Sequence, residues 1–156
     1  MRRRRAEKRE VLPDPRFNNK VMSKFINVVM WCGKKSTSEK IVYNALDKAC
    51  QKVQEKDPLK LFQKAVENVR PLLELKPRRV GGATYQVPIE VRAERGVGIA
   101  MKWIRNAARG KKGHPMEDKL CDELVAAFKG EGAAMKKREE THKMAEANKA
   151  FAHFRW

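Results

Sequence analysis

The chain has 156 residues, which is enough for one ordinary domain spanning residues 1–156. Lys and Arg number 36 against 19 Asp and Glu, so the net charge of +17 makes a polyanion the first expected partner. Hydrophobic residues make up 42% of the chain, which allows a packed core and argues against wholesale disorder. No stretch approaches the roughly 18 consecutive apolar residues of a membrane helix, and no secretory signal follows the basic start. We therefore expect a cytoplasmic protein with no membrane contact.

The charge is unevenly distributed along the chain. Residues 1–24 hold nine basic and three acidic residues, and residues 96–112 hold five basic residues and no acidic one. Residues 113–130 reverse the sign, with two basic and four acidic residues. An acidic segment inside a basic chain confines the positive charge to selected surfaces, which favours a docked and oriented partner.

The N-terminal half predicts an arm followed by three helices. Residues 1–18 lack apolar periodicity and contain two prolines, so we expect an extended basic arm that becomes ordered on a partner. Residues 19–71 show three helical apolar stripes. An S-x-x-E pattern from Ser36 to Glu39 predicts a capping box for the second helix, and Asp57-Pro58 predicts the start of the third. The expected buried faces are Val21, Phe25, Val28 and Val29; Ile41, Val42, Ala45, Leu46, Ala49, Cys50 and Val53; and Leu61, Phe62, Ala65, Val66 and Val69.

Residues 72–91 change from helical to alternating periodicity. Two short alternating runs flank Gly81-Gly82, which is a hairpin pattern. Pro77 and Pro88 each lack a donor for strand pairing, so neither strand can be central in a larger sheet. We predict an isolated two-stranded β-ribbon whose base packs on helices and whose tip projects.

Helical periodicity returns after the ribbon. Residues 93–129 predict a fourth and a fifth helix, and residues 133–156 predict a C-terminal helix and tail. The predicted fold class is therefore mainly α: a six-helix body with a projecting two-stranded β-ribbon and a basic N-terminal arm.

The sequence contains no pattern typical of an enzyme. Gly33-Lys34-Lys35-Ser36 is not a phosphate loop, because the first glycine of that motif would fall at Val28. The three histidines have no metal-ligand spacing, and the three cysteines lie far apart, so we expect buried, reduced thiols. We predict no catalytic residue, no metal and no cofactor. The residues concerned are His114, His142 and His153, and Cys32, Cys50 and Cys121.

Four groups of basic residues are candidate polyanion contacts: the N-terminal run, a pair beside the second helix, a pair beside the ribbon turn, and a pair in a glycine-bounded loop. They are Arg2, Arg3, Arg4 and Arg5; Lys34 and Lys35; Arg78 and Arg79; and Lys111 and Lys112. Such dispersed patches suit the recognition of folded RNA by shape and backbone. A basic architectural or regulatory DNA-binding protein is the alternative, with Lys102, Arg105, Asn106 and Arg109 as an ordinary recognition-helix pattern, and an RNA-processing enzyme is third.

Four ordered blocks resemble the family of bacterial small-subunit ribosomal protein seven over essentially the full length. The first joins Asn19, Val21 and Phe25-Ile26 to Gly33-Lys34-Lys35 and Ile41-Val42. The others are residues 65–71 (AVENVRP), residues 78–88 (RRVGGATYQVP) and residues 144–156 (MAEANKAFAHFRW).

The resemblance implies a primary binder of 16S rRNA that nucleates the head, or 3′ major domain, of the small subunit. It implies a position on the subunit interface near the exit tRNA site and the mRNA exit path, with small-subunit proteins nine and eleven as neighbours. When the family's rRNA contacts are carried over by position, they fall on Arg2–Arg5, Arg9, Lys34, Lys35, Arg78 and Arg79. Exit-site tRNA or mRNA would approach Gly81, Gly82 and Tyr85 at the ribbon tip, together with His153, Arg155 and Trp156. The contacts at Lys111 and Lys112 rest on charge alone.

Overall fold

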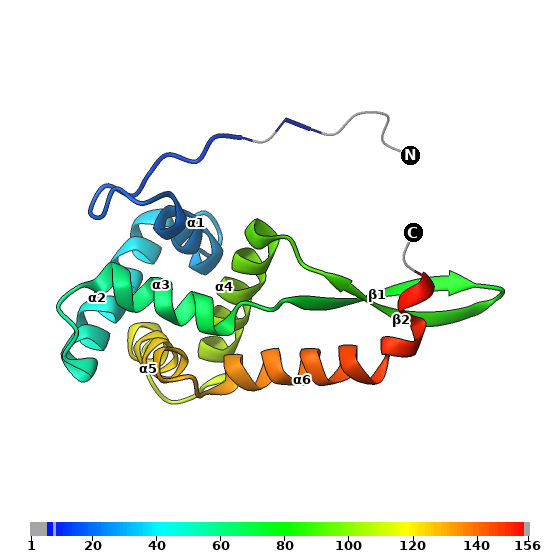
Figure 1. Cartoon of the computed structure of the whole chain (residues 1–156). Helices are drawn as coiled ribbons and strands as arrows, with labels where there is room; N and C mark the ends of the chain where they lie inside the picture. Colours follow the sequence, from blue (N-terminus) through cyan, green and yellow to red (C-terminus); the bar gives the residue numbers. More distant parts are fainter. Residues whose placement is uncertain (1–5, 8, 155–156) are drawn as a thin grey trace.

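The computed structural model describes residues 6–7 and 9–154 of the chain. A helical body carries a ribbon that extends away from it (Figure 1), in agreement with the predicted fold class. The two strands pair antiparallel from Leu73 opposite Glu90 to Val80 opposite Ala83. The elements are α1 (Lys20–Val29), α2 (Lys35–Val53), α3 (Pro58–Val69), β1 (Leu73–Val80), β2 (Ala83–Glu90), α4 (Ala93–Gly110), α5 (Met116–Lys129), α6 (Ala133–Ala147) and a 3-10 helix, η1 (Lys149–Phe154).

The core is built from the apolar stripes of α1 to α5, together with Ala134 and Met135 at the start of α6. Phe25 of α1 and Phe62 of α3 are buried with their ring centroids 5.0 Å apart. The stripe predicted for α3 is buried in full. Val21 is 36% exposed, so the prediction that it faces the core is wrong. Cys32 is also exposed, because it follows the end of α1 in a turn rather than lying on a helix face.

Two helix starts agree with the sequence prediction, and one does not. Asn19 and Asp57 cap α1 and α3, since their side chains accept backbone N–H groups of the first turn. Helix α2 instead begins one residue before Ser36, and no side chain caps it, so the predicted capping box is wrong. The hydroxyl of Ser38 is buried and donates to the Ile26 carbonyl at 2.8 Å, which ties α2 to α1.

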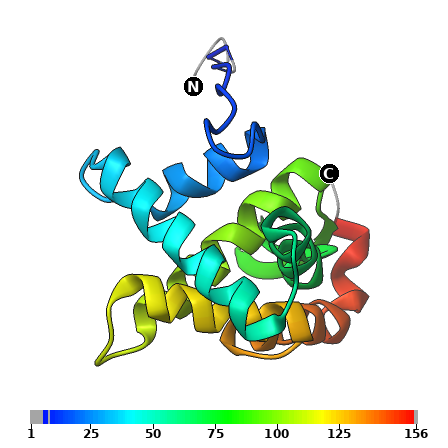
Figure 2. The same cartoon turned by 90° about the vertical axis from the view of Figure 1, so that its left-hand side faces the viewer.

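The last residues of the predicted arm are docked on the body. Asp14 is buried and accepts the Tyr43 hydroxyl at 2.6 Å, and two guanidinium nitrogens of Arg16 bind Asp47 of α2. Burial, and then the hydrogen bond to Asp14, raise the pKa of Tyr43. The chain departs from the body as an extended segment before this anchor (Figures 1 and 2). The expectation that all of residues 1–18 become ordered only on a partner therefore does not hold for Asp14 and Arg16, which already contact the body.

The C-terminal elements brace the ribbon. Helix α6 packs along β1, and η1 lies against β2 (Figure 1). Tyr85 of β2 packs against Phe151 and Phe154 of η1, at centroid distances of 5.0 and 5.3 Å. At the base, Nε2 of His142 in α6 accepts the backbone N–H of Leu72 at 3.0 Å. A two-stranded ribbon is marginally stable by itself, so these contacts hold it at a fixed angle to the body.

Candidate nucleic-acid interface

The ribbon presents its two arginines to opposite sides. Arg78 pairs with Tyr85 and Arg79 pairs with Thr84, and successive residues of a strand point to opposite faces. Arg78 is half-buried on the face that η1 covers, whereas Arg79 is exposed on the other face. Tyr85 lies in the third residue pair from the turn and packs on η1. The prediction from the sequence places it at the ribbon tip, whereas the structure places it further back along the strand.

The two residues at the tip of the ribbon are glycines, so no side chain projects from the turn. Gly81 and Gly82 have φ values of +57° and +92°, a region that L side chains rarely adopt. Neither glycine has a neighbouring atom within 4 Å of the position that a Cβ would take. A large and irregular partner such as RNA can therefore approach the backbone closely at this turn.

The loop between α1 and α2 is the second basic segment. Lys34 and Lys35 are both exposed beside Gly33, whose φ is +74°. Lys35 makes one long ion pair, 3.9 Å from Nζ to Glu39. Because no side chain caps the start of α2, its first N–H groups add to the positive field of the two lysines.

Two arginines of α4 bind backbone carbonyl groups at the end of α1. Arg105 donates to the Val28 carbonyl at 3.3 Å, and Arg109 donates to the Val29 carbonyl at 3.0 Å. Burial, and then the charge of Arg105, lower the pKa of Arg109. These contacts cap a helix C-terminus, so α4 lacks two of the side chains that a recognition helix would need.

The two lysines of the loop before α5 differ from each other. Nζ of Lys111 lies 3.1 Å from a carboxylate oxygen of Glu123, whose side chain is 1% exposed. Lys112 is exposed. Of these two predicted contacts, Lys111 is therefore engaged within the protein and Lys112 faces solvent.

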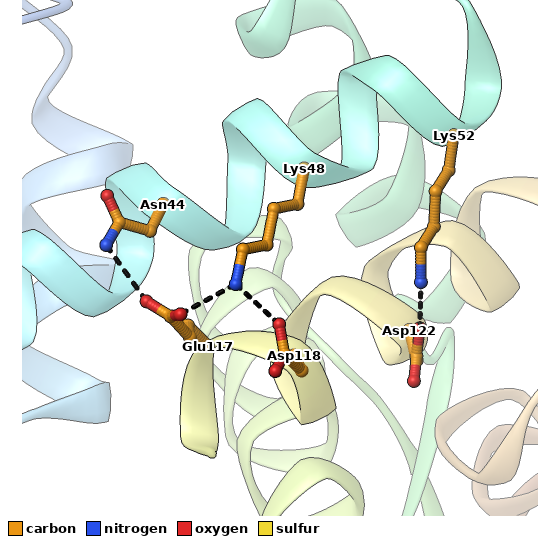
Figure 3. Close-up of polar contacts among 6 residues, drawn as sticks. All are labelled: Asn44, Lys48, Lys52, Glu117, Asp118 and Asp122. Carbon is orange, nitrogen blue, oxygen red and sulfur yellow. Dashed lines mark hydrogen bonds and ion pairs between the residues drawn. The ribbon is translucent and has the colours of Figure 1, made fainter. Parts of the chain in front are cut away.

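The acidic residues of α5 are matched by lysines of α2 (Figure 3). Lys48 binds Glu117 and Asp118, and Lys52 binds Asp122, each at 2.6 Å. The hydrogen bond from Lys48 lowers the pKa of Glu117, and that from Lys52 lowers the pKa of Asp122. This face carries little net charge, so the unpaired positive charge lies elsewhere on the molecule.

The structure also joins two lysines that the sequence places far apart. Lys24 of α1 and Lys102 of α4 line one groove between these helices, together with Val21, Val28 and Val97. The sequence indicates one of these two lysines as exposed, because Lys102 lies opposite the apolar stripe of α4. Its proximity to Lys24 depends on how the two helices pack.

The remaining predicted residues are at the termini. Arg9 is exposed in the extended arm, and His153 is exposed with Nδ1 2.8 Å from the Ala150 carbonyl oxygen. Arg2, Arg3, Arg4, Arg5, Arg155 and Trp156 lie outside the described residues. Within residues 6–7 and 9–154 there is no cluster of three or more His, Cys, Asp or Glu side chains suited to a metal ion. None of the helices in that part of the chain is long and apolar enough to cross a membrane.

The helical body with its exposed basic loop and ribbon, in a chain whose net charge is +17, defines a protein of the nucleic-acid-binding class. The sequence model of the family described as Ribosomal protein S7p/S5e matches residues 1–149, and the chain belongs to this family. It is 59% identical to small ribosomal subunit protein uS7 of Thermotoga maritima and 60% identical to that of Thermosipho africanus, over 100% of each chain. It is 57% identical to uS7 of Francisella tularensis subsp. holarctica, over 99% of each chain.

Family membership makes the chain a structural component of the ribosome and not an enzyme, as predicted. It implies that the polyanion bound by the basic surface is ribosomal RNA of the small subunit. The resemblance found in the sequence blocks is thereby confirmed.

Proposed function

We propose that this protein is a primary binder of 16S rRNA that organises the 3′ major domain and so nucleates assembly of the head. The observation that carries the proposal is the separation of the basic segments around one rigid core. The arm leaves the body beside α1, the lysine loop precedes α2, and the ribbon extends beyond α4 and α6 (Figure 1). A body with basic segments on different sides can hold several RNA helices of one junction in a fixed arrangement.

We further propose that the ribbon tip and the C-terminal segment face exit-site tRNA and mRNA at the subunit interface, with small-subunit proteins nine and eleven as neighbours. The support is the contact between η1 and β2, which places His153 and the ribbon on one continuous surface. Gly81 and Gly82 leave the backbone of the tip open to a nucleic acid.

The DNA-binding alternative is less well supported. Its candidate helix, α4, directs Arg105 and Arg109 at carbonyl groups of α1. A regulator that reads bases needs several polar side chains of one helix free to enter a groove.

The experiment is a titration of the full-length protein with a 3′ major domain fragment of 16S rRNA at several salt concentrations. The controls are an equally long fragment from another 16S domain and a DNA duplex of the same length. We expect the 3′ fragment to bind at least about 10³-fold more tightly than DNA near physiological salt. Equal affinities that fade together as salt rises would contradict the proposal, because they would reflect charge alone.

A further inference from the structure

The loop that carries Lys34 and Lys35 also holds an exposed tryptophan. Trp31 follows α1 and is 67% exposed, although its side chain is among the largest apolar groups. Cys32 and Gly33 follow it with positive φ values of 50° and 74°, so the chain turns sharply directly after the indole. This turn leaves the ring at the surface beside the start of α2.

One face of the indole rests on a fixed cation. The guanidinium carbon of Arg109 lies 4.7 Å from the ring centroid of Trp31. Arg109 is itself held, since it donates to the Val29 carbonyl at 3.0 Å. The ring is therefore supported before any partner arrives, and less conformational entropy is lost when a ligand packs on it.

The surroundings of the ring favour an anionic ligand. A cavity of about 240 Å³ opens between Trp31 and the start of α2. Lys34, Arg109, Thr37 and Met116 are among its lining residues, and the described lining contains no acidic side chain. A planar apolar surface beside two cations matches a nucleotide, whose base is flat and whose phosphate is negative.

We propose that Trp31 is a base-stacking platform that binds an unpaired base of the rRNA contacted by the Lys34–Lys35 loop. This inference rests on the proposed function. The indole supplies stacking area, Lys34 lines the same cavity, and Lys35 is the next residue along the chain and is exposed, so the two lysines can neutralise phosphates next to that base. Unpaired bases of folded RNA are commonly recognised by stacking on aromatic side chains.

The first test compares Trp31→Leu with Trp31→Phe in titrations with the 3′ major domain fragment. Stacking of one base on an aromatic side chain changes affinity by about 5- to 150-fold. We expect Trp31→Leu to bind about tenfold more weakly and Trp31→Phe to remain within about threefold of the unmodified protein. The dependence of affinity on salt should be the same in all three, because no charge is removed. Met144→Ala, which truncates an exposed apolar side chain of α6, is the matched control and should bind normally.

The second test uses a protein whose remaining tryptophan is Trp31, with Trp103→Phe and Trp156→Phe, after circular dichroism shows that it is folded. Binding of the 3′ fragment should quench the Trp31 emission. If the unmodified protein binds the fragment specifically while Trp31→Leu binds equally well and the emission is unchanged, this inference is wrong and the proposed function stands. Normal RNA binding combined with impaired incorporation of Trp31→Leu into subunits would also overturn it, in favour of a protein partner. Lack of specific binding by the unmodified protein would instead refute the proposed function.

Discussion

Glu123 decides how the last helix begins. Its side chain is buried, accepts the backbone N–H of Ala134 at 2.9 Å and forms the ion pair with Lys111. Gly132 lets the chain pass close to α5, since a Cβ there would lie 2.9 Å from the Ala126 Cβ and 3.1 Å from a carboxylate oxygen of Glu123. Helix α6 has no side-chain cap of its own, so a residue of α5 supplies the acceptor that its first turn lacks.

We expect Glu123→Ala to lower the free energy of unfolding by about 2 kcal/mol, because it leaves a buried N–H group without an acceptor. The loss of the ion pair adds little, since the Lys111 side chain is 38% exposed and can turn to water. Urea denaturation measures the change. Glu131→Ala, an exposed acidic residue of the same loop, should alter stability by no more than about 0.5 kcal/mol. Equal effects of the two substitutions would refute the capping role.

At the scale of elements, the angle of the ribbon depends on its contacts with α6 and η1. His142 of α6 accepts the Leu72 N–H at the base of β1, and Arg138 of α6 donates to the Asn68 carbonyl at the end of α3. The aromatic contacts of Tyr85 with η1 form the outer part of this brace. The ribbon therefore does not hinge freely, which suits a segment that must reach a fixed place on a large RNA.

The contact of His142 should make this brace sensitive to acid. Burial, and then the charge of Arg138, lower the pKa of His142 below its usual 6.5. The neutral ring accepts the Leu72 N–H, whereas a protonated ring cannot. Stability from this contact is therefore complete above about pH 6.5 and is lost as the pH falls through the lowered value.

We expect the free energy of unfolding to be smaller at pH 5 than at pH 7, and His142→Gln to reduce that difference. Glutamine keeps an acceptor oxygen but does not titrate. The unmodified protein, measured side by side at both pH values, is the reference. The carboxylates of Glu117 and Asp122 have lowered pKa values. The stability that their ion pairs contribute is therefore lost at lower pH than the range from pH 7 to pH 5. An identical pH dependence in His142→Gln would contradict the assignment.

For the whole molecule, the net charge of +17 matters less than its distribution. The lysines of the α2–α5 face are bound to carboxylates (Figure 3), whereas Lys34 and the ribbon residue Arg79 are exposed. Only cations that exchange small counterions for phosphates contribute to the salt dependence of RNA binding. The fold therefore separates cations that hold helices together from cations available to RNA.

This separation predicts different effects of two double substitutions. Lys34→Ala with Lys35→Ala should lower the slope of log affinity against log salt by about 2, which is about 1 for each phosphate that a lysine no longer neutralises. Lys48→Gln with Lys52→Gln removes the same charge and should leave the slope nearly unchanged while lowering stability. Titrations with the 3′ major domain fragment at four or more salt concentrations measure the slopes. An equal decrease of the slope in both variants would show that the α2–α5 face also binds RNA.

The candidate site could be predicted only in part. The sequence predicts Lys34 and Lys35 as RNA contacts beside a glycine turn, and the structure shows both side chains exposed there, which is compatible with that prediction. The arrangement of the ribbon residues was missed, since Arg78 and Arg79 look like a pair in the sequence and point to opposite faces in the strand. The ion pair between Lys111 and Glu123 was missed as well, because it joins two different elements.

The sequence by itself determined most of the elements and most of their buried faces, with exceptions such as Val21. Helical stripes such as Leu61, Phe62, Ala65, Val66 and Val69, and the alternation around Gly81-Gly82, depend on residues close together in the chain. The net positive charge likewise needs no fold to be seen. Tertiary structure decided which polar groups are free. Ser38, Arg105, Arg109 and His142 bind groups that lie 12, 77, 80 and 70 residues away, and no local pattern encodes such distances. Packing brings these groups together, and each polar group that is removed from water then forms a hydrogen bond with a neighbouring group.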